Sequence, residues 1–277
     1  MRFPCFLLSA NGDIMAIKDE IRSEREKIKG QGAKAHLSYF WDYYKIPFFI
    51  VIAAAAVIIY MISFYASKKQ VFFTAVFLNT DSGDTEAENK ISSEFSRAIG
   101  IDGDKKKAVI DMSMQERPGD NSSTQALAVS TKLSSLSDGK KLDCAVMDSY
   151  NFKTYAMSGI FSDLRNAMSE KELKNYDGRI YYIDGAKLNN ETFIDNDKVK
   201  KTDSLQEAEK KDSKKNFILP DPAEMKKPIP VGIVVEDSAV IKENDLYKES
   251  VPVFGIGRTR KDTKNAKAFL SFLDKGK

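Results

Sequence analysis

The sequence predicts an α/β domain with a largely parallel sheet and helices on both faces, preceded by one transmembrane helix. Two observations favour this fold class. Residues 46–66 hold no charged side chain, and from residue 70 onward short apolar runs alternate with amphipathic segments. Strands that alternate with helices of this length are typical of parallel sheets whose faces are covered by the helices.

Composition excludes several classes of protein. The 277 residues are 42% hydrophobic, which is enough for a packed core. Lys and Arg (43) nearly balance Asp and Glu (40), so we expect no nucleic-acid partner. Two cysteines cannot form a disulfide framework, and a single histidine, His36, argues against most histidine-dependent catalysis and metal binding. We therefore expect no cofactor and no metal.

The apolar stretch Ile46–Ala66 has the length of a membrane-spanning helix and is expected to contact the lipid bilayer. Pro47 is expected in its first turn, where a missing N–H costs little. Trp41 before the stretch and Tyr65 at its end fit the two membrane interfaces. A buried core helix and a cleavable signal peptide are the alternatives; an uncleaved signal anchor fits the length and the weak cleavage site better.

Lysine distribution predicts the orientation. Residues 26–45 carry four lysines and residues 67–86 carry two, which favours a cytoplasmic N-terminus and an extracellular domain over residues 67–277. The cytoplasmic segment 1–45 contains a short charged helix whose pattern begins at Met15, a candidate for the true translation start. The protein is thus expected in the cell membrane with a single pass.

The first half of the outer domain shows three apolar runs typical of strands: 71–78, 108–112 and 142–147. The third run has continuous apolar character, which indicates a strand buried on both faces. Helical spacing of apolar residues predicts helices at 85–99 and 123–136, between these strands.

The second half continues the pattern around a charged insertion. Residues 186–216 contain fifteen charged side chains, which predicts an exposed insertion with a short helix around 204–211 or with none. The remaining predicted elements are short helices at 152–157 and 168–173, strands at 180–183, 229–235 and 251–256, and an amphipathic helix at 263–273.

Polar residues follow the predicted strands where parallel sheets bind ligands. Such sites lie at the carboxyl ends of strands, near a switch in strand order. We therefore name Asp81, Asp148, Ser149 and Tyr150 as candidate ligand-binding residues. The prediction is architectural, because no residue at these ends identifies a chemistry by itself.

Several short matches to catalytic and metal-binding motifs lack the neighbouring residues that those motifs require. Ser137 and Lys140 match S-x-x-K, but the intervening Asp-Gly indicates a turn rather than a helix start. The acidic turns at 102–104 and 195–197 lack the glutamate that completes a calcium loop. Cys144 lies in an apolar run and is best interpreted as a small core residue. We therefore expect no enzymatic activity and name no catalytic residue.

Three segments resemble type II extracellular solute-binding proteins. They are Leu142–Leu164, with its strand, short helix and SGIFSDL turn, then Pro228–Val235 and Phe254–Leu273. The resemblance implies a lobe like those of periplasmic binding proteins. A charged helix, WDYYKIP, one span and such a domain also resemble uncharacterised membrane-anchored proteins of anaerobic Gram-positive bacteria. The chain is shorter than true solute-binding proteins, and only the region 176–216 is available for a second lobe.

Two functions remain open at this point. One is a membrane-anchored, non-catalytic module that binds or senses a small molecule or peptide at the cell surface. The alternative is a cell-envelope interaction or assembly scaffold with a protein partner and no small-molecule ligand. A ligand-dependent gain in thermal stability separates the two.

Overall fold

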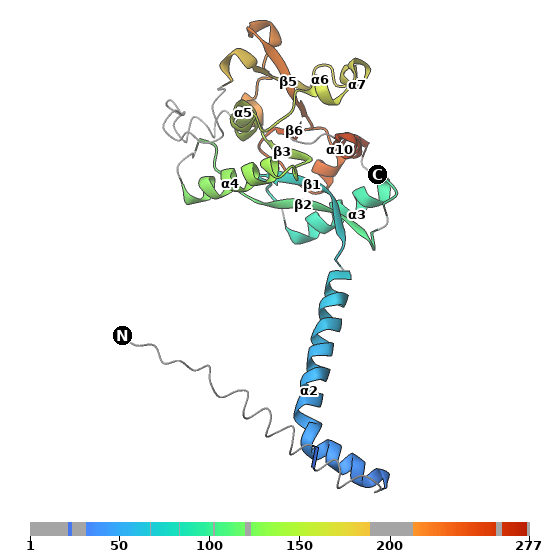
Figure 1. Ribbon diagram of the computed structural model, residues 1–277. Helices are drawn as coiled ribbons and strands as arrows, with labels where there is room; N and C mark the ends of the chain where they lie inside the picture. Colours follow the sequence, from blue (N-terminus) through green and yellow to red (C-terminus); the bar gives the residue numbers. More distant parts are fainter. Residues whose placement is uncertain are drawn as a thin grey trace, which may run out of the picture. The chain divides into compact units, whose positions relative to one another are not determined.

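The computed structural model describes residues 22–23, 32–66, 68–82, 84–101, 103–119, 123–188, 213–258 and 262–275 (Figure 1). The chain forms two compact units, 1–68 and 69–277. The predicted helix after Met15 lies outside the described residues except for two helical residues, 22–23. Most of the charged insertion, with the helix expected at 204–211, also lies outside them.

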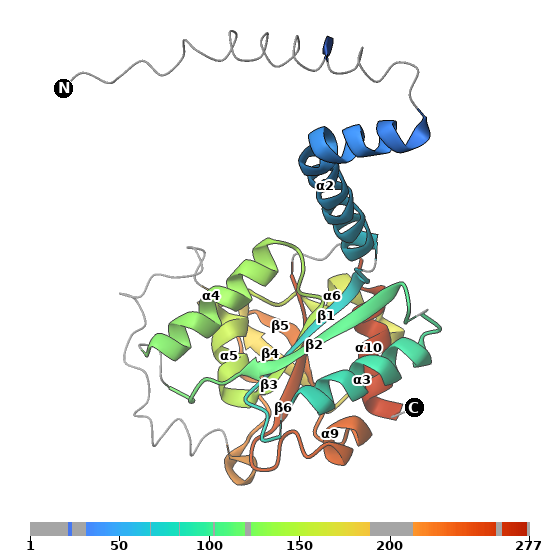
Figure 2. The ribbon, with the colours of Figure 1, turned by 90° about the horizontal axis from the view of Figure 1, so that it is seen from below.

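The first unit contains one long helix, α2 (Ala33–Ala66). Its segment Lys45–Tyr65 has a mean hydropathy of 2.6, is long and apolar enough to cross a membrane, and is not buried against protein. The predicted helix start at residue 46 is wrong, and Pro47 lies inside the helix rather than in its first turn. Residues 33–45 contain no Gly or Pro to stop a helix, so α2 continues through them. The helix also bends along its length (Figure 2).

The second unit is built on a six-stranded mixed sheet with the order β2-β1-β3-β6-β5-β4. The α/β prediction is confirmed, but only the pairs β2–β1 and β1–β3 are parallel; β6 pairs antiparallel with both β3 and β5, and β4 antiparallel with β5. Strands buried on both faces are equally apolar in either direction, so the sequence does not distinguish the two. The strands are β1 (Gln70–Leu78), β2 (Lys106–Met114), β3 (Cys144–Asp148), β4 (Ile180–Asp184), β5 (Pro228–Val234) and β6 (Pro252–Ile256).

Helices cover both faces of this sheet, as the sequence predicts (Figure 2). One face carries α3, α6, α9 and α10, and the other carries α4 and α5. The helix expected at 168–173 is only partly correct, because Met168 is extended and separates two short helices. The helices are α3 (Thr85–Ala98), α4 (Thr124–Asp138), α5 (Ser149–Met157), α6 (Leu164–Ala167), α7 (Glu170–Lys174), α9 (Ala239–Glu243) and α10 (Lys264–Lys275).

Phenylalanines fill the core between the sheet and α3 and α10. The ring centroids of Phe73 and Phe95 lie 4.8 Å apart, and Phe269 lies 4.9 Å from each. All three side chains are fully buried. The C-terminal helix is therefore joined to β1, the strand at which the chain enters the unit.

The opposite core depends on a pair of glycines. Gly232 and Gly255 face each other on β5 and β6, and the ring of Phe152 from α5 lies against both. Phe161 stacks on Phe152 with 4.6 Å between ring centroids. Without side chains at the two glycines, α5 approaches the sheet closely, and its first turn is held at the carboxyl end of β3.

Replacing Gly255 with alanine is expected to destabilise the unit by about 1–3 kcal/mol. A Cβ there would lie 2.6 Å from Phe161 Cδ1 and 2.8 Å from Phe152 Cε2, so the ring stack must move. Gly103→Ala is the control, because no atom lies within 4 Å of its Cβ position. Urea unfolding measures both variants, and equal losses would contradict the packing argument.

Candidate functional site

Asn79 begins the site at the carboxyl end of β1. Its backbone is left-handed, with φ of 61°, a conformation that asparagine tolerates better than most residues. The side-chain amide pairs with the backbone of Glu116: Nδ2 donates to the carbonyl oxygen and Oδ1 accepts from the N–H, both at 2.6 Å. This pair fixes the segment that follows β2 against the end of β1.

Asp148 joins the ends of β1 and β3 and is fully buried. Its Oδ1 caps α5 by accepting from the backbone N–H of Asn151 at 2.9 Å. Its Oδ2 accepts from the side-chain amides of Asn79 at 2.7 Å and Asn151 at 3.0 Å. Asn151 also donates to the carbonyl oxygen of Glu116 at 3.0 Å. Two carboxamides and one carboxylate therefore connect all three parallel strands at this end.

Glu116 and Tyr155 extend the network beneath the surface. The Tyr155 hydroxyl donates to Glu116 Oε2 at 2.5 Å, and both residues are buried. Burial raises the pKa of the Tyr155 hydroxyl strongly, and the neighbouring Glu116 carboxylate raises it further. The phenol therefore stays protonated at neutral pH and remains a hydrogen-bond donor.

A pocket of about 750 Å³ lies above this network. Thr80 contributes to its lining and is only 4% exposed, yet within the described part of the chain its Oγ1 has no hydrogen-bond partner. The Thr80 carbonyl, in contrast, accepts from the Gln115 side chain at 3.0 Å. The lining residues are Asn79, Thr80, Asp81, Gln115, Glu116, Arg117, Pro118, Ser123, Gln125, Ser213, Glu249 and Ser250.

The structure separates the four candidate residues predicted from sequence. Asp81 is exposed and lines the pocket, and its Oδ2 accepts from the backbone N–H of Lys248 at 2.5 Å. Asp148 and Ser149 are buried, Tyr150 is half-buried, and none of these three lines the pocket. Asp148 acts on the pocket indirectly, by holding Asn79.

Most of the lining lies outside the four residues predicted from sequence. Gln115 follows β2 directly and Thr80 is the second residue after β1, so the strand-end rule that selected Asp81 also includes them. Ser213 and Ser250 carry no such signal. They meet through an isolated antiparallel bridge between segments that lie far apart in the chain.

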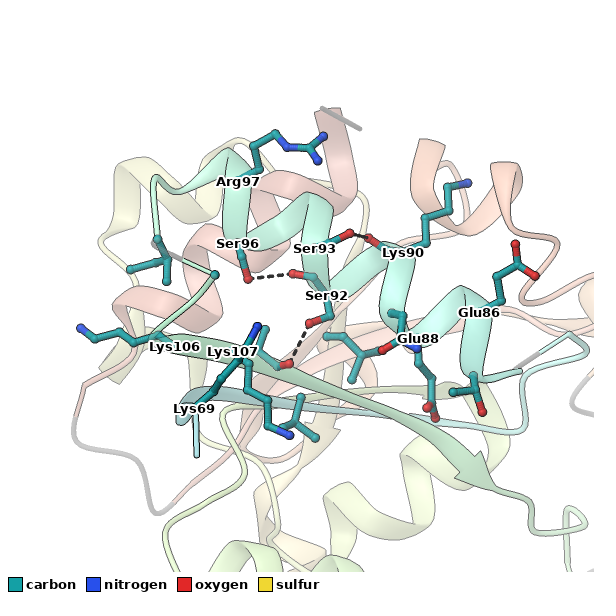
Figure 3. A pocket seen from close by; sticks show the side chains of 17 residues that line it. Lys69, Glu86, Glu88, Lys90, Ser92, Ser93, Ser96, Arg97, Lys106 and Lys107 are labelled. Carbon is teal, nitrogen blue, oxygen red and sulfur yellow. Dashed lines mark hydrogen bonds between the residues drawn. The ribbon is translucent and has the colours of Figure 1, made fainter. Parts of the chain in front are cut away.

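A second, larger groove of about 1210 Å³ lies along α3 and the edge strand β2 (Figure 3). Exposed charged side chains and the serines of α3 line it. Lys69, Arg97, Lys106 and Lys107 gather at one end, and Glu86, Glu88 and Lys90 at the other. The groove is distinct from the pocket at the carboxyl ends of the strands.

The described residues offer neither a metal-binding cluster nor an exposed thiol. Within the described part of the chain, no three His, Cys, Asp or Glu side chains form a group able to hold a metal ion. Cys144 is buried in β3, and burial raises the pKa of its thiol well above the ordinary value. No family model, no curated protein and no solved structure matches the chain.

Proposed function

We propose that this protein is a single-pass membrane protein whose α/β unit binds a small polar solute, without catalysis, in the pocket at the carboxyl ends of β1 and β2. One observation carries the proposal: Thr80 lines this pocket, and its buried hydroxyl has no hydrogen-bond partner among the residues that the structure describes. A buried hydroxyl that makes no hydrogen bond costs about 1–3 kcal/mol. A bound ligand would supply the missing partner.

The lining favours an uncharged solute rich in hydroxyl or amide groups. Asn, Gln, Ser and Thr side chains make up most of it, with Arg117 and three carboxylates among them. Amide and hydroxyl groups both donate and accept, so they match a sugar or a short peptide backbone. The Asp148 carboxylate behind the pocket and the Glu116 carboxylate in its lining already accept internal hydrogen bonds, which suits recognition better than proton transfer.

The membrane part of the proposal depends on α2. A 21-residue apolar segment with its side chains exposed would be unstable in water, and lipid provides the matching environment. The excess of lysines before this segment favours a cytoplasmic N-terminus, which places the α/β unit outside the cell. A solute-binding unit outside the membrane agrees with the resemblance to extracellular solute-binding proteins.

Thermal unfolding of the full chain in nanodiscs tests the binding proposal. The chain is heated alone and with sugars, amino acids, short peptides and cell-wall fragments. A ligand at a hundred times its Kd stabilises by about 2.7 kcal/mol, which for a unit of this size raises Tm by about 5–10 °C.

Thr80→Val is the diagnostic variant because it removes the hydroxyl and keeps the shape. It is expected to at least halve the ligand-induced shift, while its own stability without ligand stays equal or rises by about 1 kcal/mol. Thr131→Val, at an exposed position of α4, should keep the full shift. A folded protein whose Tm responds to no solute class would contradict the proposal and favour the envelope scaffold.

A further inference from the structure

Three lysines lie at the end of the sheet where the chain enters the second unit. Strand pairing sets Lys106 beside Gln70 and Lys107 beside Val71, so the lysines that begin β2 lie next to Lys69. Arg97, in the last turn of α3, lies at the same end of the groove (Figure 3). All four side chains are exposed. Among the residues that the structure describes, none of the four forms an ion pair.

Several polar side chains along the rest of the groove already make hydrogen bonds within the protein. Glu88 Oε1 accepts from the Met112 N–H at 2.8 Å, and the Ser92 hydroxyl donates to the Ala108 carbonyl oxygen at 2.7 Å. These contacts from α3 protect the outer edge of β2 against pairing with another strand. Lys90, at the end of the groove opposite the basic residues, donates to Asn244 Oδ1 at 3.0 Å. The side chains that remain available to bind a partner are therefore positively charged, and they lie at the amino ends of β1 and β2.

Chain length keeps this basic end close to the apolar helix. Helix α2 ends at Ala66 and β1 begins at Gln70, so their Cα atoms can be at most about 14 Å apart in any orientation of the two units. Lys68 lies in this connection, with its Nζ 4.6 Å from the centroid of the Phe64 ring. A lysine above aromatic rings at the end of an apolar helix is typical of the membrane interface.

We propose that Lys69, Arg97, Lys106 and Lys107 bind the headgroups of anionic phospholipids in the membrane that α2 spans. The inference rests on the proposed membrane insertion and is independent of the solute pocket. Several basic side chains near a membrane surface attract anionic lipid, and each contributes about a five-fold increase in binding. The contact would hold the unit by the amino end of β1, while the pocket lies at the carboxyl end of the same strand.

Lysine acylation of the full chain in nanodiscs tests this contact. Discs of phosphatidylcholine alone are compared with discs that also contain phosphatidylglycerol, and mass spectrometry gives the rate at each lysine. In the anionic discs, Lys69, Lys106 and Lys107 should react at least about five-fold more slowly. Lys242 and Lys248, near the carboxyl end of β1, should react equally in both discs. At 1 M salt, where the screening length falls to about 3 Å, the difference should disappear.

A pair of matched variants identifies the residues responsible. Lys106→Gln with Lys107→Gln should reduce the protection of Lys69 by at least about five-fold, and Lys242→Gln with Lys248→Gln should leave it unchanged. Equal acylation rates in the two kinds of disc would overturn the proposal. So would protection of Lys69 by free inorganic phosphate in phosphatidylcholine discs, because it would indicate a general anion site. A chain that does not co-purify with discs would refute membrane insertion itself, which separates that failure from a failure of lipid binding.

Discussion

Asp148→Ala is expected to destabilise the α/β unit by about 3–5 kcal/mol. The carboxylate is fully buried, caps α5 and accepts hydrogen bonds from the amides of Asn79 and Asn151. Its removal costs about 1 kcal/mol for the lost cap and about 1–2 kcal/mol for each of the two amides, which lose this acceptor but still donate to the Glu116 carbonyl oxygen. Asn79 would also lose part of its support, so the same variant should weaken solute binding at the neighbouring pocket.

Chemical unfolding of the full chain in detergent measures this loss, with Asp84→Ala as the matched control. Asp84 caps α3 in the same way, accepting from the Ala87 N–H at 2.8 Å, but it is exposed and supports no buried amide. Its replacement should cost only about 1 kcal/mol. If both variants lose the same free energy, the buried network contributes nothing beyond the cap.

Phe269→Ala is expected to lower the free energy of unfolding by about 3–5 kcal/mol. The ring is fully buried and contacts Phe73 and Phe95 at 4.9 Å between centroids, so truncation leaves a cavity between α10, α3 and β1. Neighbouring aromatic rings cannot close such a space without leaving their preferred rotamers.

The same unfolding measurement tests this truncation against two other variants. Phe269→Leu keeps most of the volume and should recover more than half of the loss. Ile218→Ala removes an apolar side chain that is 85% exposed and should change stability by less than about 0.5 kcal/mol. A small effect of Phe269→Ala would show that α10 is not part of the cooperative core.

The hydrophobic pattern of a single segment was sufficient to predict several helices and strands. The run at 142–147 is apolar except for Asp143, and β3 is buried at all five positions. The amphipathic pattern at 263–273 predicted α10, whose buried residues include Phe269 and Leu273. Gly100, just after α3, has a left-handed backbone with φ of 69°, which is common where a helix ends.

Strand direction and side-chain contacts between distant segments could not be predicted from the hydrophobic pattern. The sequence alone did not show that β6 inserts antiparallel between β3 and β5, because a strand covered on both faces is apolar whichever way it runs. It also did not show that Asp148 holds Asn79, since the two residues lie 69 positions apart in the chain.

The sequence by itself therefore determined the apolar span and the α/β class, because these follow from local periodicity and hydropathy. Only the tertiary structure decided that Asp148 serves as an internal anchor, that Thr80 has an unpartnered hydroxyl at the pocket, and that Lys69 and Lys106 share one basic end. Hydrogen-bond satisfaction and charge clustering depend on which distant segments meet, and strand pairing sets that arrangement.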